Sequence, residues 1–376
     1  MPDTPRALGF RMPAEWEPHE ATWIAWPHNR DDWPGRFAPI PWVYAEIVRK
    51  LTRVERVRIL IKDGPAEANA RRVLRKAGAN LDAVEFFHAP TDRSWTRDYC
   101  PLFVKNRAGH HAGEVALTNW RFNAWAKYDD WSNDAAIPAT LAAALKLRAW
   151  ETGLVLEGGS IDVNGRGLLL TTEECLLSPV QARNPQLTRR EIETALRDYL
   201  GVRQVIWLRN GIAGDDTHGH IDDLARFVNP NTVVIASEPD RTDPNHEPLR
   251  ENLAILRKLP LRVVKLPMPA PLIFNGRRLP ASYANFYIAN GLVLMPTFND
   301  PHDRIALNTL ARLFPDREVT GIHAVELVWG LGTLHCMTQQ QPEFWSVTPS
   351  NPMIPQETGW RAANHGRSRL LGGQAG

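Results

Sequence analysis

The segment NFYIANGLVLMPT, at residues 285–297, places an Asn-Gly pair between two apolar runs. Asn-Gly is typical of a type I′ turn, in which both central residues need a positive φ, so this segment predicts a tight β-hairpin. The same pattern occurs in SIDVNGRGLLLTT at 160–172 and in LARFVNPNTVVIAS at 224–237, and a further turn signal begins at Asn106. The turns recur about every 60 residues, which indicates a chain built from repeated modules.

An amphipathic helix and then a single strand are expected after each of the three hairpins. The helix at 188–200 is marked most clearly, because Thr188 and Glu191 can form a capping box and Gly201 can end the helix. Further helices are expected at about 43–52, 66–77, 247–258 and 304–314. One hairpin, one helix and one strand in each period predict an α/β chain of roughly five modules, and such modules usually close into a ring.

An open, doubly wound α/β sheet is the alternative arrangement. Such a sheet would carry a glycine-rich turn from a strand into a helix, with an acidic residue further along the chain. The nearest candidate, GLGTLH at 330–335, precedes an expected strand instead of opening a helix. We therefore favour the cyclic repeat.

The composition excludes several classes of protein. Of the 376 residues, 43% are apolar and 23% are charged, which is the balance of a folded chain. The formal net charge is only +2 and no block of like charges occurs, so neither nucleic acid nor a membrane surface is expected as a partner. The absence of a long apolar run, of a secretory signal and of a disulfide framework predicts a cytoplasmic protein.

Polar side chains recur at one place in the repeat, shortly before each turn. Asp98, Glu157, Asp222 and Asn285 each lie five to eight residues before a turn signal. Repeated modules place equivalent positions on the same rim, so we expect these four side chains to converge near the axis of the ring.

The three cysteines lie in different surroundings. Cys336 follows a glycine-rich segment and His335 and precedes three glutamines, and it begins a strand that we expect to complete the ring. This setting makes Cys336 a candidate nucleophile. Cys100 and Cys175 are expected to be small packing residues, which is the usual role of a lone cysteine.

His218, His220 and Asp222 form the most suggestive local cluster. On a strand, alternate residues share one face, so the three side chains would point in the same direction. They could hold a metal ion, or His220 could be a general base that a carboxylate orients. The spacing alone leaves both interpretations open.

Several carboxylates in one pocket with tryptophan walls indicate a cationic, planar ligand, and a guanidinium group fits best. Two carboxylates that grip its terminal nitrogens would direct its central carbon at a thiolate, which is a strong nucleophile. We expect a protonated His220 to stabilise the Cys336 thiolate, to donate a proton to departing ammonia and then to activate water. This chemistry requires no metal and no cofactor.

Eight segments carry a resemblance to a known family. They are MPAEWEPHEATWIAWPHNRDDW at 12–33, WTRDYCP at 95–101, WRFNAW at 120–125, LEGGSIDVNG at 156–165, LLTTEECLLSP at 169–179, GDDTHGHIDDLARFV at 214–228, ASYANFYIANG at 281–291 and LHCMTQQQP at 334–342. In this order they resemble the agmatine deiminase / bacterial peptidylarginine deiminase family. The resemblance implies a five-bladed α/β propeller, the pentein fold, in a single catalytic domain at 1–345. A C-terminal extension at 346–376, with a disordered end, would follow.

The resemblance also implies a role for each site residue. Cys336 would be the nucleophile and His220 the general acid and base, Asp98 and Asp222 would hold the guanidinium group, and Glu157 would support the histidine. The other residues expected to bind substrate are Trp95 on the guanidinium plane, Asp216 near a distal amine, Asn285 and His218. His218 departs from the aspartate that is common at its position, and GLGT at 330–333 departs from the usual GGGN or GGGS.

The implied activity is hydrolysis of agmatine to N-carbamoylputrescine and ammonia through an amidino-thioether on Cys336, in putrescine biosynthesis and polyamine metabolism. Deimination of peptidyl arginine or of another substituted guanidine is the alternative within the family. Free arginine is less favoured, since only Arg97 and Arg121 are candidates to bind its carboxylate. A metallohydrolase and a cation-binding module are more remote alternatives. A small guanidinium compound is the expected partner, and a homo-oligomer is left open.

Overall fold

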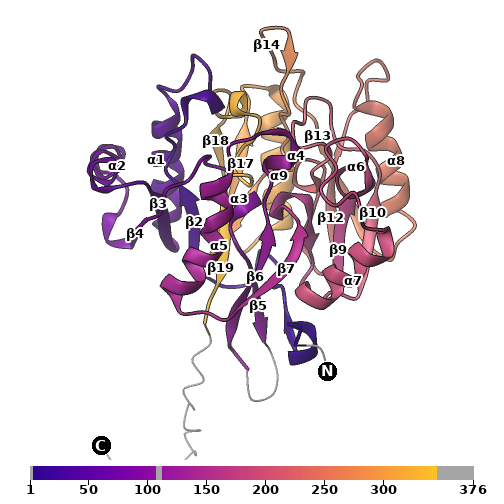
Figure 1. Cartoon of the computed structure of the whole chain (residues 1–376). Coiled ribbons are helices and arrows are strands. Elements are labelled where there is room, and N and C mark those ends of the chain that lie inside the picture. The colour runs from indigo at the N-terminus through magenta and orange to yellow at the C-terminus, as the bar shows by residue number, and fades with distance from the viewer. Residues whose placement is uncertain (1–2, 107–111, 345–376) are drawn as a thin grey trace, which may run out of the picture. The chain divides into compact units, whose positions relative to one another are not determined.

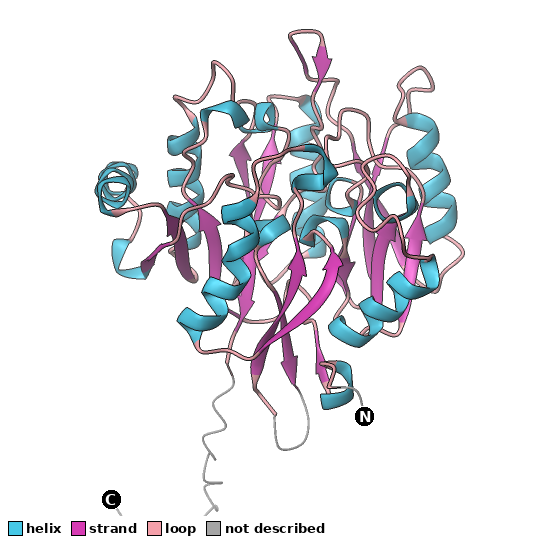
Figure 2. Ribbon diagram, viewed as in Figure 1, coloured by secondary structure: helices cyan, strands magenta, loops and turns pink. Residues whose placement is uncertain are grey.

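The computed structural model describes residues 3–106 and 112–344. The chain has a mixed α/β fold (Figure 1), and Figure 2 shows helices at both sides of the view with strands between them. Part of the turn signal at Asn106 falls on residues 107–111, which lie outside the described residues, as does the expected C-terminal extension at 346–376.

Five sheets share one plan, in which two antiparallel strands are followed by a helix and by a strand parallel to the second. Four of these sets follow one another along the chain. The first consists of β5 (Leu102–Asn106), β6 (Val115–Arg121), α5 (Ser132–Leu145) and β7 (Ala149–Val155), and the second of β8 (Asp162–Val163), β9 (Leu168–Thr172), α7 (Arg189–Leu200) and β10 (Gln204–Leu208). The third consists of β11 (Ala225–Asn229), β12 (Thr232–Ser237), α8 (His246–Leu256) and β13 (Arg262–Pro267), and the fourth of β16 (Tyr287–Ala289), β17 (Leu292–Thr297), α9 (Pro301–Leu313) and β18 (Glu318–His323).

The fifth set combines two distant parts of the chain. The strand β19 (Gln339–Pro342) pairs antiparallel with β2 (His19–Ala25), and α1 (Ile40–Leu51) then leads to the parallel strand β3 (Arg56–Ile61). The helix α2 (Gly64–Ala77) then leads to β4 (Val84–His88), which pairs parallel with β3 and extends this sheet. The strand β1 (Phe10–Arg11) joins the sheet of β5. The pairing of β19 with β2 brings the C-terminal end of the described chain beside its first module.

The best-marked helix forms as predicted. In α7 the Thr188 side chain accepts a hydrogen bond from the Glu191 amide, and the Glu191 carboxylate accepts one from the Thr188 amide. Gly201 ends the helix in the left-handed conformation, with φ of +65°. Local capping therefore sets both ends of this helix, as the sequence indicates.

The helix α1 begins at Ile40, about three residues earlier than predicted, and α2 and α9 also begin early. The helix α2 starts at Gly64 because the Asp63 side chain accepts a hydrogen bond from the Ala66 amide at 2.9 Å. The helix α9 starts at Pro301 because Asp300 caps it in a capping box. In both helices an aspartate precedes a proline in the first turn, a start signal that extends the helix beyond its amphipathic part.

The hairpin that decides the fold uses a different turn from the one predicted. Gly291 has φ of +71°, but Asn290 does not take the positive φ that a type I′ turn requires. The Asn290 side chain accepts a hydrogen bond from the His19 amide at 3.0 Å and donates one to the His19 carbonyl at 2.8 Å. This contact with β2 holds Asn290 in another conformation, so the hairpin forms with a tertiary anchor at its turn.

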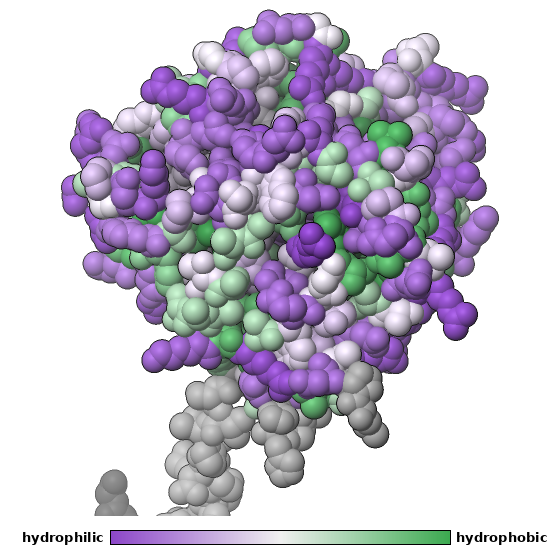
Figure 3. Space-filling view, viewed as in Figure 1, coloured by the Kyte–Doolittle hydropathy of each residue, from purple (hydrophilic) through white to green (hydrophobic). Residues whose placement is uncertain are grey.

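One face of the molecule is largely polar. Figure 3 shows a face dominated by hydrophilic residues, with hydrophobic residues in small scattered groups. In the described part of the chain, no helix has the length and apolar character needed to span a membrane.

Candidate functional site

The predicted site residues lie just before the first strand of an antiparallel pair, in the short segments that enter the five repeated sheets. Asp98 lies in α3 (Thr96–Tyr99) before β5, Glu157 before η5 (Gly158–Ser160) and β8, Asp222 in η6 (Ile221–Asp223) before β11, Asn285 before β16 and Cys336 before β19. All of these side chains are buried. Equivalent positions of the repeat therefore supply the buried polar groups.

A cavity of about 280 Å³ opens onto part of this group. Among the predicted residues, its lining includes Trp95, Asp98, Asp216 and Cys336. The remaining lining residues are Asp31, Asp32, Arg93, Trp125, Tyr128, Asp130, Thr217, Gly330, Leu331 and Gly332. Five of the lining side chains are aspartates and one is an arginine, so the cavity favours a cationic ligand.

The imidazole of His220 lies among three carboxylates. Its Nδ1 atom is 3.9 Å from Oδ1 of Asp98 and 3.9 Å from Oδ1 of Asp222, and its Nε2 atom is 3.8 Å from Oε2 of Glu157. Burial alone would lower the pKa of His220, but the Asp98 charge, followed by Cys175 and Glu157, raises it well above its usual value. His220 is therefore a cation that can donate a proton.

Asp98 and Glu157 differ strongly in acidity. Burial raises the pKa of Asp98 to about 6. The charge of His220 lowers this pKa, and the charges of Asp222 and Glu157 raise it. Burial also tends to raise the pKa of Glu157, but the charges of Arg183 and His220 lower it to about 2. The Nε atom of Arg183 lies 3.0 Å from Oε1 of Glu157. Glu157 is thus a permanent anion beside the histidine.

Asp98 is held by two donors. The Trp125 Nε1 atom donates to Oδ2 at 2.9 Å, and the Gly159 amide donates to Oδ1 at 3.0 Å. A side chain at Gly159 would collide with this arrangement, since a Cβ atom there would lie 2.6 Å from Nδ1 of His220 and 2.8 Å from Oδ1 of Asp98. Glycine is therefore required where the histidine and the carboxylate meet.

Cys336 is surrounded by acids and amides. Its Sγ atom lies 3.6 Å from Oδ2 of Asp222, and the Asn285 Nδ2 atom donates to Sγ at 3.1 Å. Burial, followed by Asp222, Asp223 and Asp98, raises the pKa of Cys336 well above its usual value. Burial and the surrounding carboxylates therefore favour the thiol form of Cys336, and stabilisation of a thiolate by His220 stays a prediction.

His335 fixes the position of Asp222. Its Nδ1 atom lies 2.8 Å from Oδ2 of Asp222, and its Nε2 atom lies 2.7 Å from Oε2 of Glu15. Glu15 in turn forms an ion pair with Arg226 at 2.9 Å. This buried chain of contacts lies directly behind the candidate nucleophile, and sequence reasoning gave neither His335 nor Glu15 a role in it.

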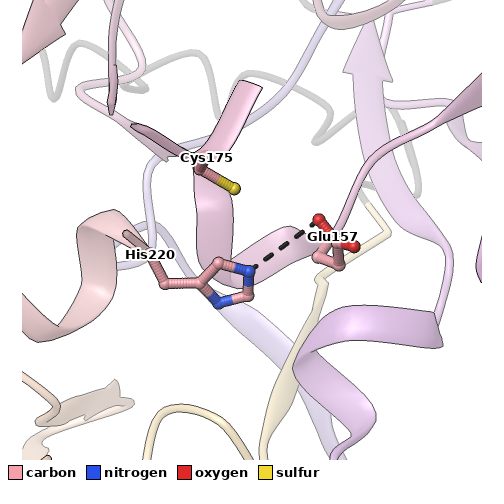
Figure 4. A group of neighbouring side chains, drawn as sticks. All are labelled: Glu157, Cys175 and His220. Carbon is pink, nitrogen blue, oxygen red and sulfur yellow. Dashed lines mark ion pairs between the residues drawn. The ribbon is translucent and has the colours of Figure 1, made fainter. Parts of the chain in front are cut away.

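Cys175, expected to pack in the core, is buried beside the histidine (Figure 4). Among the described residues, one group of three side chains could hold a metal ion: Glu157, Cys175 and His220. Their potential ligand atoms lie within 4.8 Å of one another. The Arg183 guanidinium on Glu157 and the raised pKa of His220 both oppose binding of a cation there. These three residues therefore fit a metal ion poorly.

His218 lies away from the cavity lining. The prediction that His218, His220 and Asp222 share a strand face is wrong, because this segment forms a turn and a 3₁₀ helix. His218 has φ of +63°, and its Nε2 atom lies 3.0 Å from Oγ of Ser178. The three residues thus do not form the metal site considered from the sequence.

Asp216 lines the cavity, but groups of this chain already bind both of its oxygens. Oδ1 accepts hydrogen bonds from Lys127 and Arg277, each at 2.6 Å, and Oδ2 accepts one from the Tyr128 hydroxyl at 2.7 Å. Asn285 does not line the cavity; its amide nitrogen donates to the Cys336 thiol and to Asp223, and its oxygen accepts from Thr333.

Sequence reasoning also missed the arginine of the site. Arg97 is buried against Gln340 and Glu15, and Arg121 is exposed, so neither lines the cavity. Arg93 does line it, but its guanidinium lies 2.7 Å from Asp32 and 2.6 Å from Asp130. The acidic pair in HNRDDW at 28–33 was the available signal for this part of the cavity.

Comparisons with known proteins identify the relatives of this chain. The model of the Porphyromonas-type peptidyl-arginine deiminases matches residues 11–342. The chain belongs to this family. It is 39% identical over 369 residues to the agmatine deiminase of Pseudomonas aeruginosa (strain LESB58). This alignment covers 90% of this chain and 97% of the relative.

Two further relatives extend this result. The agmatine deiminase of Medicago truncatula is 37% identical over 376 residues, covering 90% of this chain and 98% of the relative. The solved structure of the agmatine deiminase of Enterococcus faecalis matches with a TM-score of 0.83 and 33% identity, over 91% of this chain and 98% of that chain. The family resemblance seen in the sequence is thus confirmed.

Proposed function

We propose that this protein is an agmatine deiminase, which hydrolyses agmatine to N-carbamoylputrescine and ammonia. The observation that carries the proposal is the thiol of Cys336 beside the Asp98, Asp222 and His220 cluster, at a cavity lined by five aspartates. The relatives named as agmatine deiminases, which match nearly the whole chain, support the same substrate.

The fold belongs to this proposal. Five sheets of one plan, with their functional residues at equivalent positions, support a five-bladed α/β propeller of the pentein type. The axis of such a ring is the natural meeting point for one residue from each repeat. A single catalytic domain at 1–345 follows from the same arrangement.

The first half-reaction begins when the guanidinium group binds. Asp98 and Asp222 grip its nitrogens, and Trp95 offers an aromatic surface for its plane, a contact worth about 0.5–2 kcal/mol. Burial and the nearby carboxylates raise the pKa of Cys336. The positive charge of the ligand offsets the carboxylates, so the thiol releases its proton to solvent as the substrate enters. The cationic substrate thereby activates its own nucleophile.

The thiolate then attacks the central guanidinium carbon. As the C–N bond to a terminal nitrogen breaks, the protonated His220 donates its proton to that nitrogen, which leaves as ammonia. An amidino-thioether on Cys336 remains. Glu157, kept anionic by Arg183, stabilises the cationic form of His220 from which this proton comes.

The second half-reaction uses the neutral imidazole. His220 removes a proton from water, and the resulting hydroxide attacks the amidino carbon. The C–S bond then breaks as the new hydroxyl group loses its proton to solvent, which releases the ureido product and the Cys336 thiolate. The proton taken from water restores the cationic His220. The product would reach putrescine through a hydrolase that removes the carbamoyl group.

The cavity favours agmatine over arginine and peptidyl arginine. Those two substrates would need a cationic side chain for a carboxylate or many polar contacts for a peptide. Arg93, the arginine in the lining, is shared between Asp32 and Asp130 and so is not free to bind a carboxylate. The net negative lining instead attracts the second cation of agmatine.

A ureido-product assay with agmatine, arginine and peptides that end in arginine tests the proposal. We expect agmatine to have the highest kcat/KM. Cys336→Ala should abolish turnover of agmatine while leaving its binding measurable, and Cys100→Ser, whose thiol lies outside the cavity lining, serves as the matched control. If kcat/KM is higher for arginine or for the peptides than for agmatine, the proposed substrate is wrong and that compound takes its place.

A further inference from the structure

Two aspartates of the cavity lining differ in whether their oxygens are already occupied. Both oxygens of Asp216 accept hydrogen bonds from this chain, with Lys127 and Arg277 on one oxygen and Tyr128 on the other. In Asp32 the Oδ1 atom accepts from Arg93 at 2.7 Å, whereas the Oδ2 atom has no hydrogen-bond partner in the described chain. Asp32 therefore has an oxygen with no donor at all, whereas each oxygen of Asp216 already has at least one.

Burial makes this open acceptor significant. The Asp32 side chain is only 1% exposed, so bulk water does not compensate for the missing partner. A buried carboxylate oxygen without a donor is unfavourable, and a ligand that supplies a donor removes that penalty. Asp32 lines the same cavity as Cys336, and Tyr44 lies close enough to both for each to influence its ionisation.

The charge balance around Asp32 leaves room for one more cation. Arg93 is shared between Asp32 and Asp130. Burial raises the pKa of Asp32 to about 7, so these three groups carry a net charge of −1 when Asp32 is ionised, the state that a neighbouring ammonium group favours. The set around Asp216 has the opposite balance, because Lys127 and Arg277 together exceed its single charge. An ammonium group in the cavity is attracted to the first set and repelled by the second.

We infer that Asp32, and not Asp216, binds the distal ammonium group of the substrate and makes the enzyme selective for guanidines with a cationic far end. The inference rests on the proposed function, because it assumes a guanidinium group held at Cys336. The four methylene groups of agmatine would link the guanidinium at Cys336 to the ammonium at Asp32. Asp32 would accept the hydrogen bond through Oδ2 while keeping Arg93 on Oδ1.

The test compares kcat/KM for agmatine and for butylguanidine, which has no amine. In the wild type, agmatine should be preferred. Asp32→Asn keeps the shape of the side chain and should lower kcat/KM for agmatine by about 10- to 100-fold, mainly through KM, since a charged hydrogen bond is lost. The value for butylguanidine should change by no more than about threefold.

Two matched variants serve as controls. Asp130→Asn removes the other carboxylate on Arg93 but leaves Oδ2 of Asp32 in place, so it should lower the preference for agmatine by less than Asp32→Asn does. Asp216→Asn should leave the ratio of the two substrates unchanged. If Asp32→Asn lowers both substrates equally, Asp32 only supports Arg93 and the inference is overturned. If Asp216→Asn abolishes the preference, the ammonium binds there instead.

The outcomes separate the inference from the proposed function. If the wild type releases no ureido product from either guanidine, the proposed function fails and the inference fails with it. If it hydrolyses both without preferring agmatine, the deiminase function stands and the inference alone is overturned. If Asp32→Asn does not fold and shows no thermal unfolding transition, Asp216→Asn provides the test. A preference for agmatine that is retained in Asp216→Asn supports binding of the ammonium at Asp32, and a preference that is lost overturns it.

Discussion

The Sγ atom of Cys336 lies 3.6 Å from the Oδ2 atom of Asp222, so the candidate nucleophile rests against a carboxylate. Burial, followed by the Asp222 charge, raises the pKa of the thiol, and the opposite change is expected when that charge is removed. In the proposed function the same carboxylate holds the substrate. Asp222 therefore suppresses the thiolate in the free enzyme and promotes its chemistry in the complex.

Asp222→Asn should separate these two effects. Without substrate, the variant should react faster with iodoacetamide at Cys336 near neutral pH, because the pKa of the thiol falls toward its usual value. Turnover of agmatine should fall about 10²- to 10³-fold, as for the loss of other preorganised electrostatic contacts. Mass spectrometry of the Cys336 peptide and the ureido assay measure the two quantities. Asp316→Asn, at an exposed position, is the control, and unchanged or slower alkylation of Asp222→Asn would contradict the argument.

Gly159→Ala should inactivate the enzyme without removing a functional group. The new Cβ atom would lie 2.6 Å from Nδ1 of His220 and 2.8 Å from Oδ1 of Asp98, so at least one of these side chains must move. We expect kcat/KM to fall at least about 100-fold, since misplacement by about 1 Å is enough for such a loss. Overpacking should also lower the free energy of unfolding by about 1–3 kcal/mol.

Gly64→Ala is the matched control for this substitution. Gly64 is the first residue of α2, and no atom lies within 4 Å of the position of its added Cβ. Activity should stay at the wild-type level and thermal stability should be unchanged or slightly higher. Wild-type activity of Gly159→Ala, measured beside this control, would mean that His220 and Asp98 are not closely packed across the glycine.

Local signals made the repeat and much of the site predictable. The capping box of Thr188 and Glu191 acts within one helix, so the sequence contains all of the information that sets that end. The spacing of Asp98, Glu157 and Asp222 from their turns likewise reflects one local plan used several times. For that reason these residues could be grouped before their distances were known.

Long-range partners explain what could not be predicted. The turn at Asn290 is set by His19, which is 271 residues away in the chain. Arg93 is held by Asp32, 61 residues away, and nothing in either segment indicates the other. His218 departed from the expected strand because its positive φ turns it toward Ser178, a conformation that a side chain's type does not reveal.

Turnover should withstand removal of metal ions. Glu157, Cys175 and His220 are close enough to bind one, but a metal there would have to displace the proton of His220 and lie near the Arg183 guanidinium. After dialysis against EDTA, kcat for agmatine should remain within about twofold of the untreated value. Activity that disappears and returns when zinc or manganese is added would show that a metal takes part.

Trp125→Phe should shift the acid limb of the pH profile to higher pH. The Trp125 Nε1 atom donates to Oδ2 of Asp98 at 2.9 Å, and this hydrogen bond lowers the pKa of a carboxyl group that burial raises to about 6. Asp98 must be ionised to grip the guanidinium group, so kcat/KM falls as the pH drops through this pKa. Loss of the donor raises the pKa further.

The pH at which kcat/KM falls on the acid side should therefore rise by about half a pH unit to one pH unit, because this shift corresponds to the free energy of one hydrogen bond. The measurement is kcat/KM for agmatine from pH 5 to 9, with each profile scaled to its own plateau because Trp125 also lines the cavity. Trp120→Phe in the same WRFNAW segment is the control, since its Nε1 atom donates to Thr118 and its limb should not move. A limb that stays in place in Trp125→Phe, or moves to lower pH, would mean that ionisation of Asp98 does not set the acid side of the profile.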